Sequence, residues 1–131
     1  MKFRWKRVVF RIRVKGPKKL LGHLRVKDYR ENKEAARGRA LARLSHFNQF
    51  YNLKVGKVFI RNQKSRWGSC SSKGNLNFNY KIAMLPSELS DYIIVHELCH
   101  LAQMNHSKNF WSLVEQQIPN YKNLRAELKK Y

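Results

Sequence analysis

The chain has 131 residues, a net charge of +20 and a hydrophobic content of 43%. These values exclude a wholly disordered chain and leave room for one hydrophobic core, so we predict a single domain over residues 1–131. The longest uncharged apolar runs fall far short of the ~20 residues of a membrane helix. We therefore expect no membrane partner, and we take a monomer as the default.

The positive charge is concentrated in the first half of the chain. Residues 1–66 contain 21 of the 28 Lys and Arg residues but only 3 of the 8 Asp and Glu residues. This asymmetry favours a polyanionic partner, so we expect DNA or RNA to contact the basic half. A basic surface without a specific partner would give the same composition, and the sequence leaves that alternative open.

The two cysteines, Cys70 and Cys99, are too few for a disulfide framework. The basic N-terminus lacks the apolar run of a signal peptide, because Arg and Lys interrupt it. We therefore expect reduced thiols in a cytoplasmic protein.

We predict that residues 1–30 form a strongly basic N-terminal strand region. Phe3–Val14 alternates with the two-residue period of a strand, and Gly16-Pro17 ends it. Leu20–Val26 is a second, shorter candidate strand.

The middle of the chain combines one predicted helix with two predicted strands. From Glu31 to Tyr51, apolar residues recur every three or four positions, which indicates an amphipathic helix. Lys57–Gln63 and Asn75–Tyr80 alternate with a period of two and indicate strands. Because a Gly- and Ser-rich loop joins these strands, we expect an antiparallel hairpin, whose free edge could pair with an extended peptide.

Three helices are predicted in the remaining part. Pro86 and Ser87 begin a helix that is apolar on nearly every side, so we expect it at the centre of the domain. Ser107 is a suitable N-cap for a helix over residues 108–117, and a last helix covers residues 121–130.

The central predicted helix carries an H-E-x-x-H motif, formed by His96, Glu97 and His100, and His106 follows it. Residues four apart lie on one helix face, so His96 and His100 can bind one metal ion, with His106 as a third ligand. Three nitrogen ligands and one open position are the arrangement of a catalytic zinc site. Glu97 lies beside that face, where it can act as general base on a water molecule that the metal activates.

Five motifs occur together and in order: R-W-G-S-C-S from Arg66, G-N-L-N-F-N from Gly74, L-P-S-E-L from Leu85, V-H-E-L-C-H-L from Val95 and N-H-S-K-N-F-W from Asn105. With these motifs the chain resembles the YgjP-like zinc metallopeptidases, which are related to the SprT/Spartan and WLM families. The resemblance implies a zincin-like domain, zinc binding by the three histidines, and Glu97 as general base. We accordingly predict an α+β fold in which an antiparallel sheet packs on a central active-site helix followed by C-terminal helices.

The histidine spacing also resembles the metzincin motif, H-E-x-x-H-x-x-G-x-x-H, but Gln103 stands in place of its glycine. We therefore expect the chain to reach His106 by a longer helix or by a turn at Met104-Asn105.

Three hypotheses for the function follow. The first is a zinc-dependent metallopeptidase that cleaves a protein or peptide, including protein associated with nucleic acid. The second is a metal-dependent nucleoside triphosphate pyrophosphohydrolase, which the lack of a glycine-rich phosphate loop disfavours. The third is a basic nucleic-acid-binding module with a structural metal, which would have no use for Glu97.

Residues near the site were also assigned from the sequence. The candidates for substrate binding are Arg66, Trp67, Asn77, Asn79 and Tyr80. The candidates for stabilising an oxyanion are Arg66, Tyr80, Tyr92 and Tyr121, among which the sequence does not choose.

Overall fold

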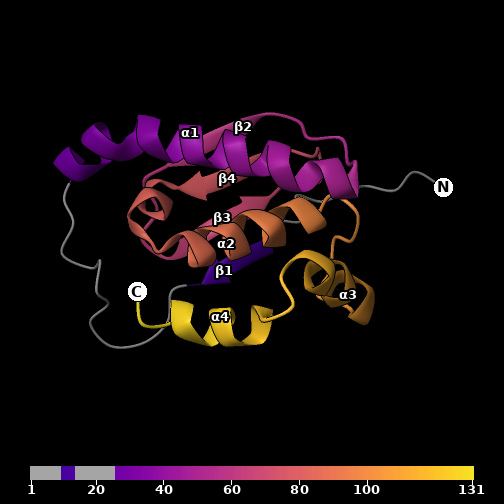
Figure 1. The fold of residues 1–131 in the computed structure, drawn as a ribbon. Helices are drawn as coiled ribbons and strands as arrows, with labels where there is room; N and C mark the ends of the chain where they lie inside the picture. The colour runs from indigo at the N-terminus through magenta and orange to yellow at the C-terminus, as the bar shows by residue number, and fades with distance from the viewer. Residues whose placement is uncertain (1–9, 14–25) are drawn as a thin grey trace.

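The computed structural model describes residues 10–13 and 26–131 of the chain (Figure 1). In these ranges the chain forms one sheet, a short 3₁₀ helix and four α-helices. The elements in chain order are β1 (Phe10–Arg13), α1 (Val26–Tyr51), β2 (Val58–Arg61), β3 (Arg66–Cys70), β4 (Leu76–Asn79), η1 (Tyr80–Met84), α2 (Ser87–Cys99), α3 (Lys108–Gln117) and α4 (Tyr121–Leu128).

The strands of the described residues form a mixed sheet in the order β1-β3-β4-β2. β3 pairs antiparallel with β1 and with β4, whereas β2 pairs parallel with β4. The prediction of an antiparallel sheet is therefore wrong for β2, and the hairpin joins β3 to β4. The Gly- and Ser-rich segment predicted as a loop between the two strands contains β3. Because β3 runs antiparallel to β4 and lies between β2 and β4 in the sequence, β2 and β4 run in the same direction. β3 has no alternation of apolar and polar residues because Trp67 to Cys70 are all buried.

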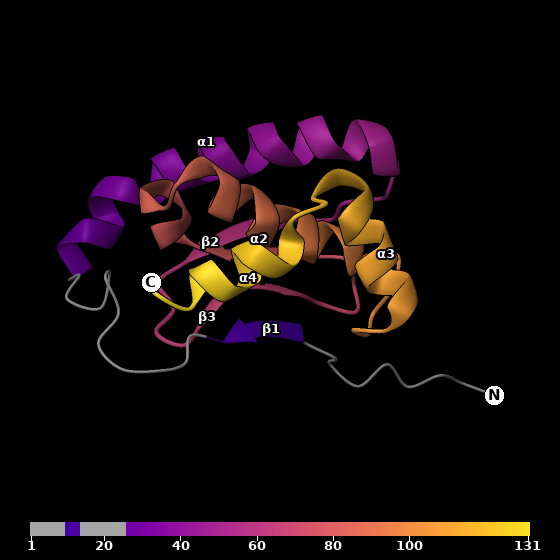
Figure 2. The ribbon, with the colours of Figure 1, turned by 60° about the horizontal axis from the view of Figure 1, so that its bottom comes forward.

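Helix α2 is at the centre of the fold, as predicted. It contacts α1, α3 and α4 as well as β3 and β4. Figures 1 and 2 show α1 and α2 on one face of the sheet. Helices α3 and α4 lie on the side of α2 that faces away from α1. Apolar residues surround α2 on all sides, and every residue from Leu89 to Cys99 except Asp91 is buried. The predicted α+β class and the central position of the motif helix are confirmed.

Helix α1 packs along the sheet and α2 through the predicted apolar stripe. Ala36, Ala40, Leu44 and Phe47 are all buried. The helix is also tied to α2 by a two-pronged ion pair, in which Arg43 Nε and Nη2 donate to the Asp91 carboxylate at 2.9 and 3.1 Å.

The N-terminal prediction is confirmed in part. Residues 10–13 form a strand, as expected, but α1 begins at Val26, so residues 26–30 are helical and the predicted strand region ends too late. The rest of Phe3–Val14 and of Leu20–Val26 lies outside the described residues. None of the described helices is long and apolar enough to cross a bilayer.

We predict that Ile94→Ala in α2 lowers the free energy of unfolding by about 2–5 kcal/mol, because Ile94 is fully buried and the truncation leaves a cavity. Urea unfolding measures this change. Leu41→Ala is the matched control, since Leu41 is 48% exposed and its removal leaves no cavity. Equal losses in the two variants would contradict the central position of α2.

Candidate metal centre

His96 and His100 lie one turn apart near the end of α2, and both are buried. Their Nε2 atoms are 3.2 Å apart, because side chains four residues apart on a helix lie above each other. The buried helix thus presents two imidazole nitrogens toward one point.

His106 reaches the same point from the connection between α2 and α3. After Cys99 the helix tightens, with Leu101 N–H donating to Leu98 O and Ala102 N–H to Cys99 O, and the chain then bends at Met104 and Asn105. This places His106 Nε2 3.1 Å from the Nε2 of His100 and 3.2 Å from that of His96. The turn at Met104-Asn105, one of the two predicted paths, is the one observed.

The three nitrogens fit a tetrahedral metal ion. Zinc–imidazole bonds of 2.0–2.1 Å at tetrahedral angles place the nitrogens about 3.3 Å apart, close to the observed spacing. His100 Nδ1 donates to the Gln103 carbonyl at 2.9 Å, which leaves the Nε2 lone pair for a metal. His96 Nδ1 lies 3.4 Å from the Tyr92 hydroxyl, so Tyr92 supports a histidine, and its contact with an oxyanion stays a prediction.

Burial keeps His96 and His100 neutral, and it acts less strongly on His106, which is exposed. It lowers the pKa of His100 to about 4 and that of His96 well below its usual value. The pKa of His106 is also lowered, by burial and then by the charge of Arg125. Neutral imidazole is the form that binds a metal, so the three side chains are ready to bind a cation near neutral pH.

Two aromatic residues at the start of α3 hold the three imidazole rings. Phe110 is buried, stacks on His100 with ring centroids 4.2 Å apart, and meets the rings of His96 and His106 edge-on. Trp111 lies nearly parallel to His106 at 5.8 Å. The sequence showed Phe110 and Trp111 only as part of the apolar stripe of a helix, and the fold gives them this contact with the ligands.

Glu97 is fully buried, and neither of its carboxylate oxygens has a hydrogen-bond partner among the described residues. Burial raises its pKa well above the usual value. An unpaired buried carboxylate is destabilising, whereas a metal cation held by the neighbouring histidines would stabilise its ionised form. This unsatisfied carboxylate is therefore independent evidence that a metal ion fits the site.

Gly68 on β3 provides the space for Glu97. A Cβ atom at this position would lie 2.9 Å from both Cγ and Oε2 of Glu97 and 3.1 Å from the Asn77 carbonyl oxygen. The sheet can therefore approach α2 this closely only with glycine at position 68. Gly68 lies within the R-W-G-S-C-S motif, but the sequence alone indicates no role for it, because its partner Glu97 is distant in the sequence.

The five residues predicted to bind substrate differ in their burial. Trp67, Asn79 and Tyr80 are buried, and the Asn79 side-chain amide donates to the carbonyls of Gln63 and Arg66. Arg66 and Asn77 are only partly buried. A contact with substrate stays a prediction for all five.

The two cysteines are buried thiols without a disulfide. Burial raises the pKa of each to about 12, with the charge of Glu97 adding to the effect on Cys70. Thiols of this kind stay protonated near neutral pH and are poor nucleophiles and metal ligands.

Comparisons with known proteins agree with this geometry. A model of the YgjP-like metallopeptidase domain matches residues 11–131. The crystal structure of the metallopeptidase zymogen of Pyrococcus abyssi abylysin is similar, with a TM-score of 0.61 and 27% sequence identity over 68% of this chain and 90% of that chain. No curated protein matches the sequence. The fold is therefore that of a small zincin-like metallopeptidase domain.

We predict that Gly68→Ala lowers the free energy of unfolding by about 1–3 kcal/mol, because the added methyl group must push β3 away from Glu97. Gly38→Ala is the control, since nothing lies within 4 Å of a Cβ there and alanine favours the helix by about 0.5–1 kcal/mol. Urea unfolding of both variants checks the opposite signs. A harmless Gly68→Ala substitution would contradict the close approach of β3 to α2.

Proposed function

Because the chain belongs to the YgjP-like metallopeptidase family, we propose that it is a zinc peptidase in which His96, His100 and His106 bind the metal and Glu97 is the general base. Three imidazole ligands favour zinc among the common metals. The observation that carries the proposal is the buried Glu97 carboxylate, which has no hydrogen-bond partner among the described residues and adjoins a histidine ligand in sequence.

A zinc ion bound there would acidify a water molecule and polarise the carbonyl of the scissile peptide bond. Glu97 takes a proton from the attacking water at one carboxylate oxygen and passes it to the leaving amine. The burial that raises its pKa makes the ionised carboxylate a stronger base. Phe110 stacks on the buried His100 and meets the buried His96 edge-on, which shields these two rings from bulk water and strengthens the electrostatic interactions there.

The family and the similar zymogen support a peptidase over the nucleotide pyrophosphohydrolase. The Glu97 carboxylate supports a catalytic metal site rather than a structural one. Its proposed role requires a water molecule on the metal, and a structural site leaves no position for water. The buried thiols of Cys70 and Cys99 support the further proposal that the protein acts in the reducing cytoplasm.

We expect Glu97→Gln to keep the bound zinc and to lower peptide turnover by a factor of at least about 10², because the variant lacks the base. His100→Ala should lose the zinc itself, since it removes a ligand. Zinc content by elemental analysis and cleavage of an unfolded protein such as casein measure the two effects separately. Full activity of purified Glu97→Gln would remove Glu97 as the base.

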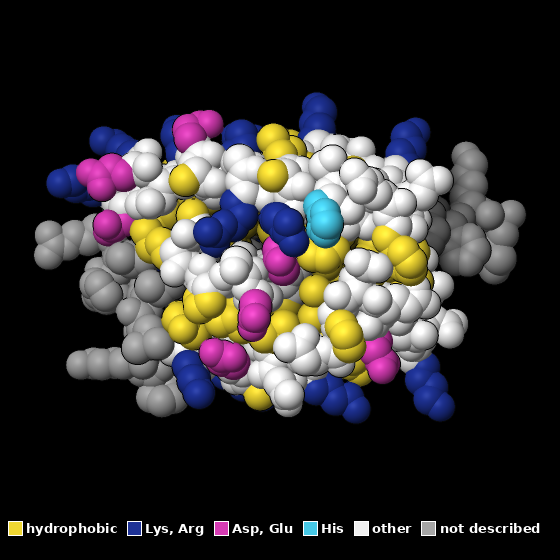
Figure 3. Space-filling view, viewed as in Figure 1, with side chains coloured by type: hydrophobic (Ala, Val, Ile, Leu, Met, Phe, Trp, Pro, Cys, Tyr) yellow, Lys and Arg dark blue, Asp and Glu magenta, His cyan; other side chains and the backbone are white. Residues whose placement is uncertain are grey.

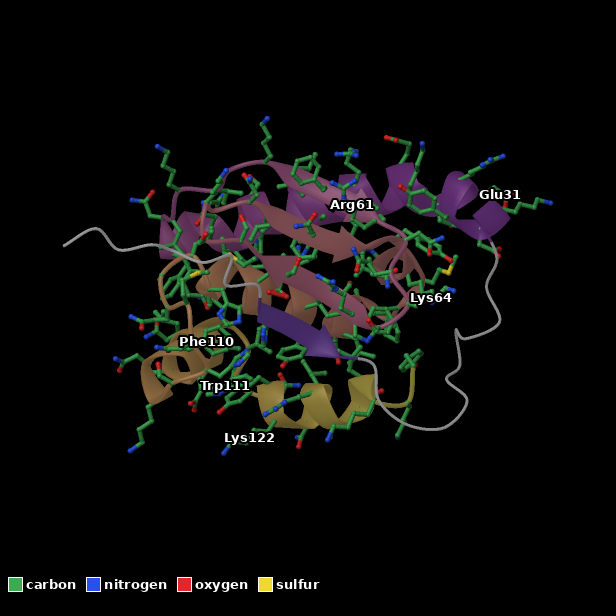
Figure 4. The ribbon with its side chains drawn as sticks, turned by 180° about the vertical axis from the view of Figure 1, so that it is seen from behind. Glu31, Arg61, Lys64, Phe110, Trp111 and Lys122 are labelled. Carbon is green, nitrogen blue, oxygen red and sulfur yellow. The ribbon has the colours of Figure 1, made fainter. Side chains whose placement is uncertain are left out.

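We also propose that nucleic acid binds at the edge of the sheet formed by β2. Lys54, Lys57, Arg61 and Lys64 are exposed on β2 and its flanking loops, and residues 35–87 contain no Asp or Glu. Figure 4 shows Arg61 at the end of β2 and Lys64 on the loop that follows it, at the end of the sheet. On the face in Figure 3, by contrast, acidic side chains lie among the basic ones. A polyanion would therefore find less repulsion at the β2 edge.

For this surface we expect binding of a single-stranded oligonucleotide to weaken steeply with salt, because bound phosphates release counterions. The triple variant Lys57→Gln, Arg61→Gln and Lys64→Gln should bind more weakly and reduce the slope of log K against log [salt] by about 2–3. A triple variant with the same charge change, Lys108→Gln, Lys122→Gln and Lys130→Gln, is the control. Fluorescence anisotropy measures both, and equal effects of the two triple variants would argue against the β2 edge.

A further inference from the structure

Arg125 lies on α4 and is held beside the metal ligands by an aromatic side chain. Its guanidinium carbon is 5.1 Å from the centre of the Trp111 ring. Trp111 in turn stacks on His106 and meets the ring of His96 edge-on at 5.6 Å. A single indole ring therefore contacts both this cation and two of the three histidines.

The position of Arg125 is fixed by rigid elements. Tyr121, one turn earlier on α4, stacks on Trp111 with ring centroids 5.0 Å apart and an interplanar angle of 14°. The same helix is anchored by the buried side chains of Leu124 and Leu128. Trp111 thus contacts both Tyr121 and Arg125, which orients the guanidinium before any ligand arrives.

The guanidinium of Arg125 has no acidic partner: among the described residues, no carboxylate lies within ion-pair distance of it. Arg43 differs, because Asp91 occupies its guanidinium. Arg125 is also exposed, so its N–H donors face solvent. Its charge reaches the site, since it contributes to lowering the pKa of Tyr92 against the larger effect of burial, which raises it.

A fixed, exposed guanidinium is suited to a carboxylate, which it binds with two parallel hydrogen bonds. We propose that Arg125 determines specificity by binding a carboxylate of the substrate close to the scissile bond, so that this peptidase prefers peptides that carry a carboxylate at that position. This inference rests on the proposed peptidase function and adds a substrate class to it. The carboxylate belongs either to an Asp or Glu side chain or to the free C-terminus of a peptide.

The test uses fluorogenic peptides that differ only in Glu or Gln at one position flanking the scissile bond, each with a free or an amidated C-terminus. We expect the zinc-loaded wild type to prefer the carboxylate-bearing member of one pair by about 10-fold or more, as a charge-assisted hydrogen bond allows. The pair that shows the preference identifies the source of the carboxylate. Arg125→Gln should lower that ratio toward one, and Arg125→Lys should retain part of it.

Lys122→Gln is the control, because it removes the same charge from α4 and the exposed Lys122 side chain has no ion pair among the described residues. It should keep the wild-type ratio. Zinc content and melting temperature of each variant exclude a loss of the site. A wild type without preference, or an Arg125→Gln variant that loses activity equally on both peptides, would overturn the proposal.

Equilibrium binding separates this inference from the proposed function. The affinity of zinc-loaded Glu97→Gln for the same peptides, measured by anisotropy with and without Arg125→Gln, requires no turnover. If the wild type cleaves none of the peptides, the peptidase proposal fails, and the binding ratio still decides whether Arg125 selects a carboxylate. Equal affinities of the Arg125-containing protein for the carboxylate-bearing and the neutral peptide would reject the proposed role of Arg125.

Discussion

The structure depends on the burial of α2, the helix that carries two histidines and a glutamate and is buried from Leu89 to Cys99 at every residue except Asp91. In a buried position an imidazole is kept neutral and a carboxylate is costly without a partner. The same burial that forms the core therefore creates both neutral imidazoles at His96 and His100 and a carboxylate at Glu97 without a partner among the described residues. A metal ion would bind the neutral imidazoles and would stabilise the ionised Glu97 carboxylate.

The elements around α2 are arranged to serve this helix. β3 approaches closely enough to cover Glu97 because position 68 is glycine. The start of α3 places Phe110 against all three imidazoles, and the bend before it delivers His106. α4 then adds Tyr121 and Arg125 behind Trp111. Catalytic geometry of this kind needs support from several elements, because ligands and base must be held to within a fraction of an ångström.

Most of the positive charge lies in a different part of the sequence from the histidine cluster and Glu97. The motif helix lies in the nearly neutral second half of the sequence, and most of the basic residues belong to the first half. Our proposals assign the exposed lysines and arginines near β2 to a polyanion and the single guanidinium of Arg125 to a substrate carboxylate. Both follow from the same physical feature, a cation without an acidic partner in the described part of the chain. They differ in whether the cation is isolated and oriented or part of an extended surface.

The sequence by itself predicted the cluster of three histidines, the class of fold and the extent of most helices. His96, Glu97 and His100 are predictable because a helix places residues at fixed angles, and α2 because its apolar residues leave it no exposed face. Only the tertiary structure decided that β3 exists and that β2 runs parallel to β4, because a strand buried on both faces has no alternation to detect. The roles of Gly68, Phe110 and Arg125 likewise depend on residues distant in the sequence, which local periodicity cannot bring together.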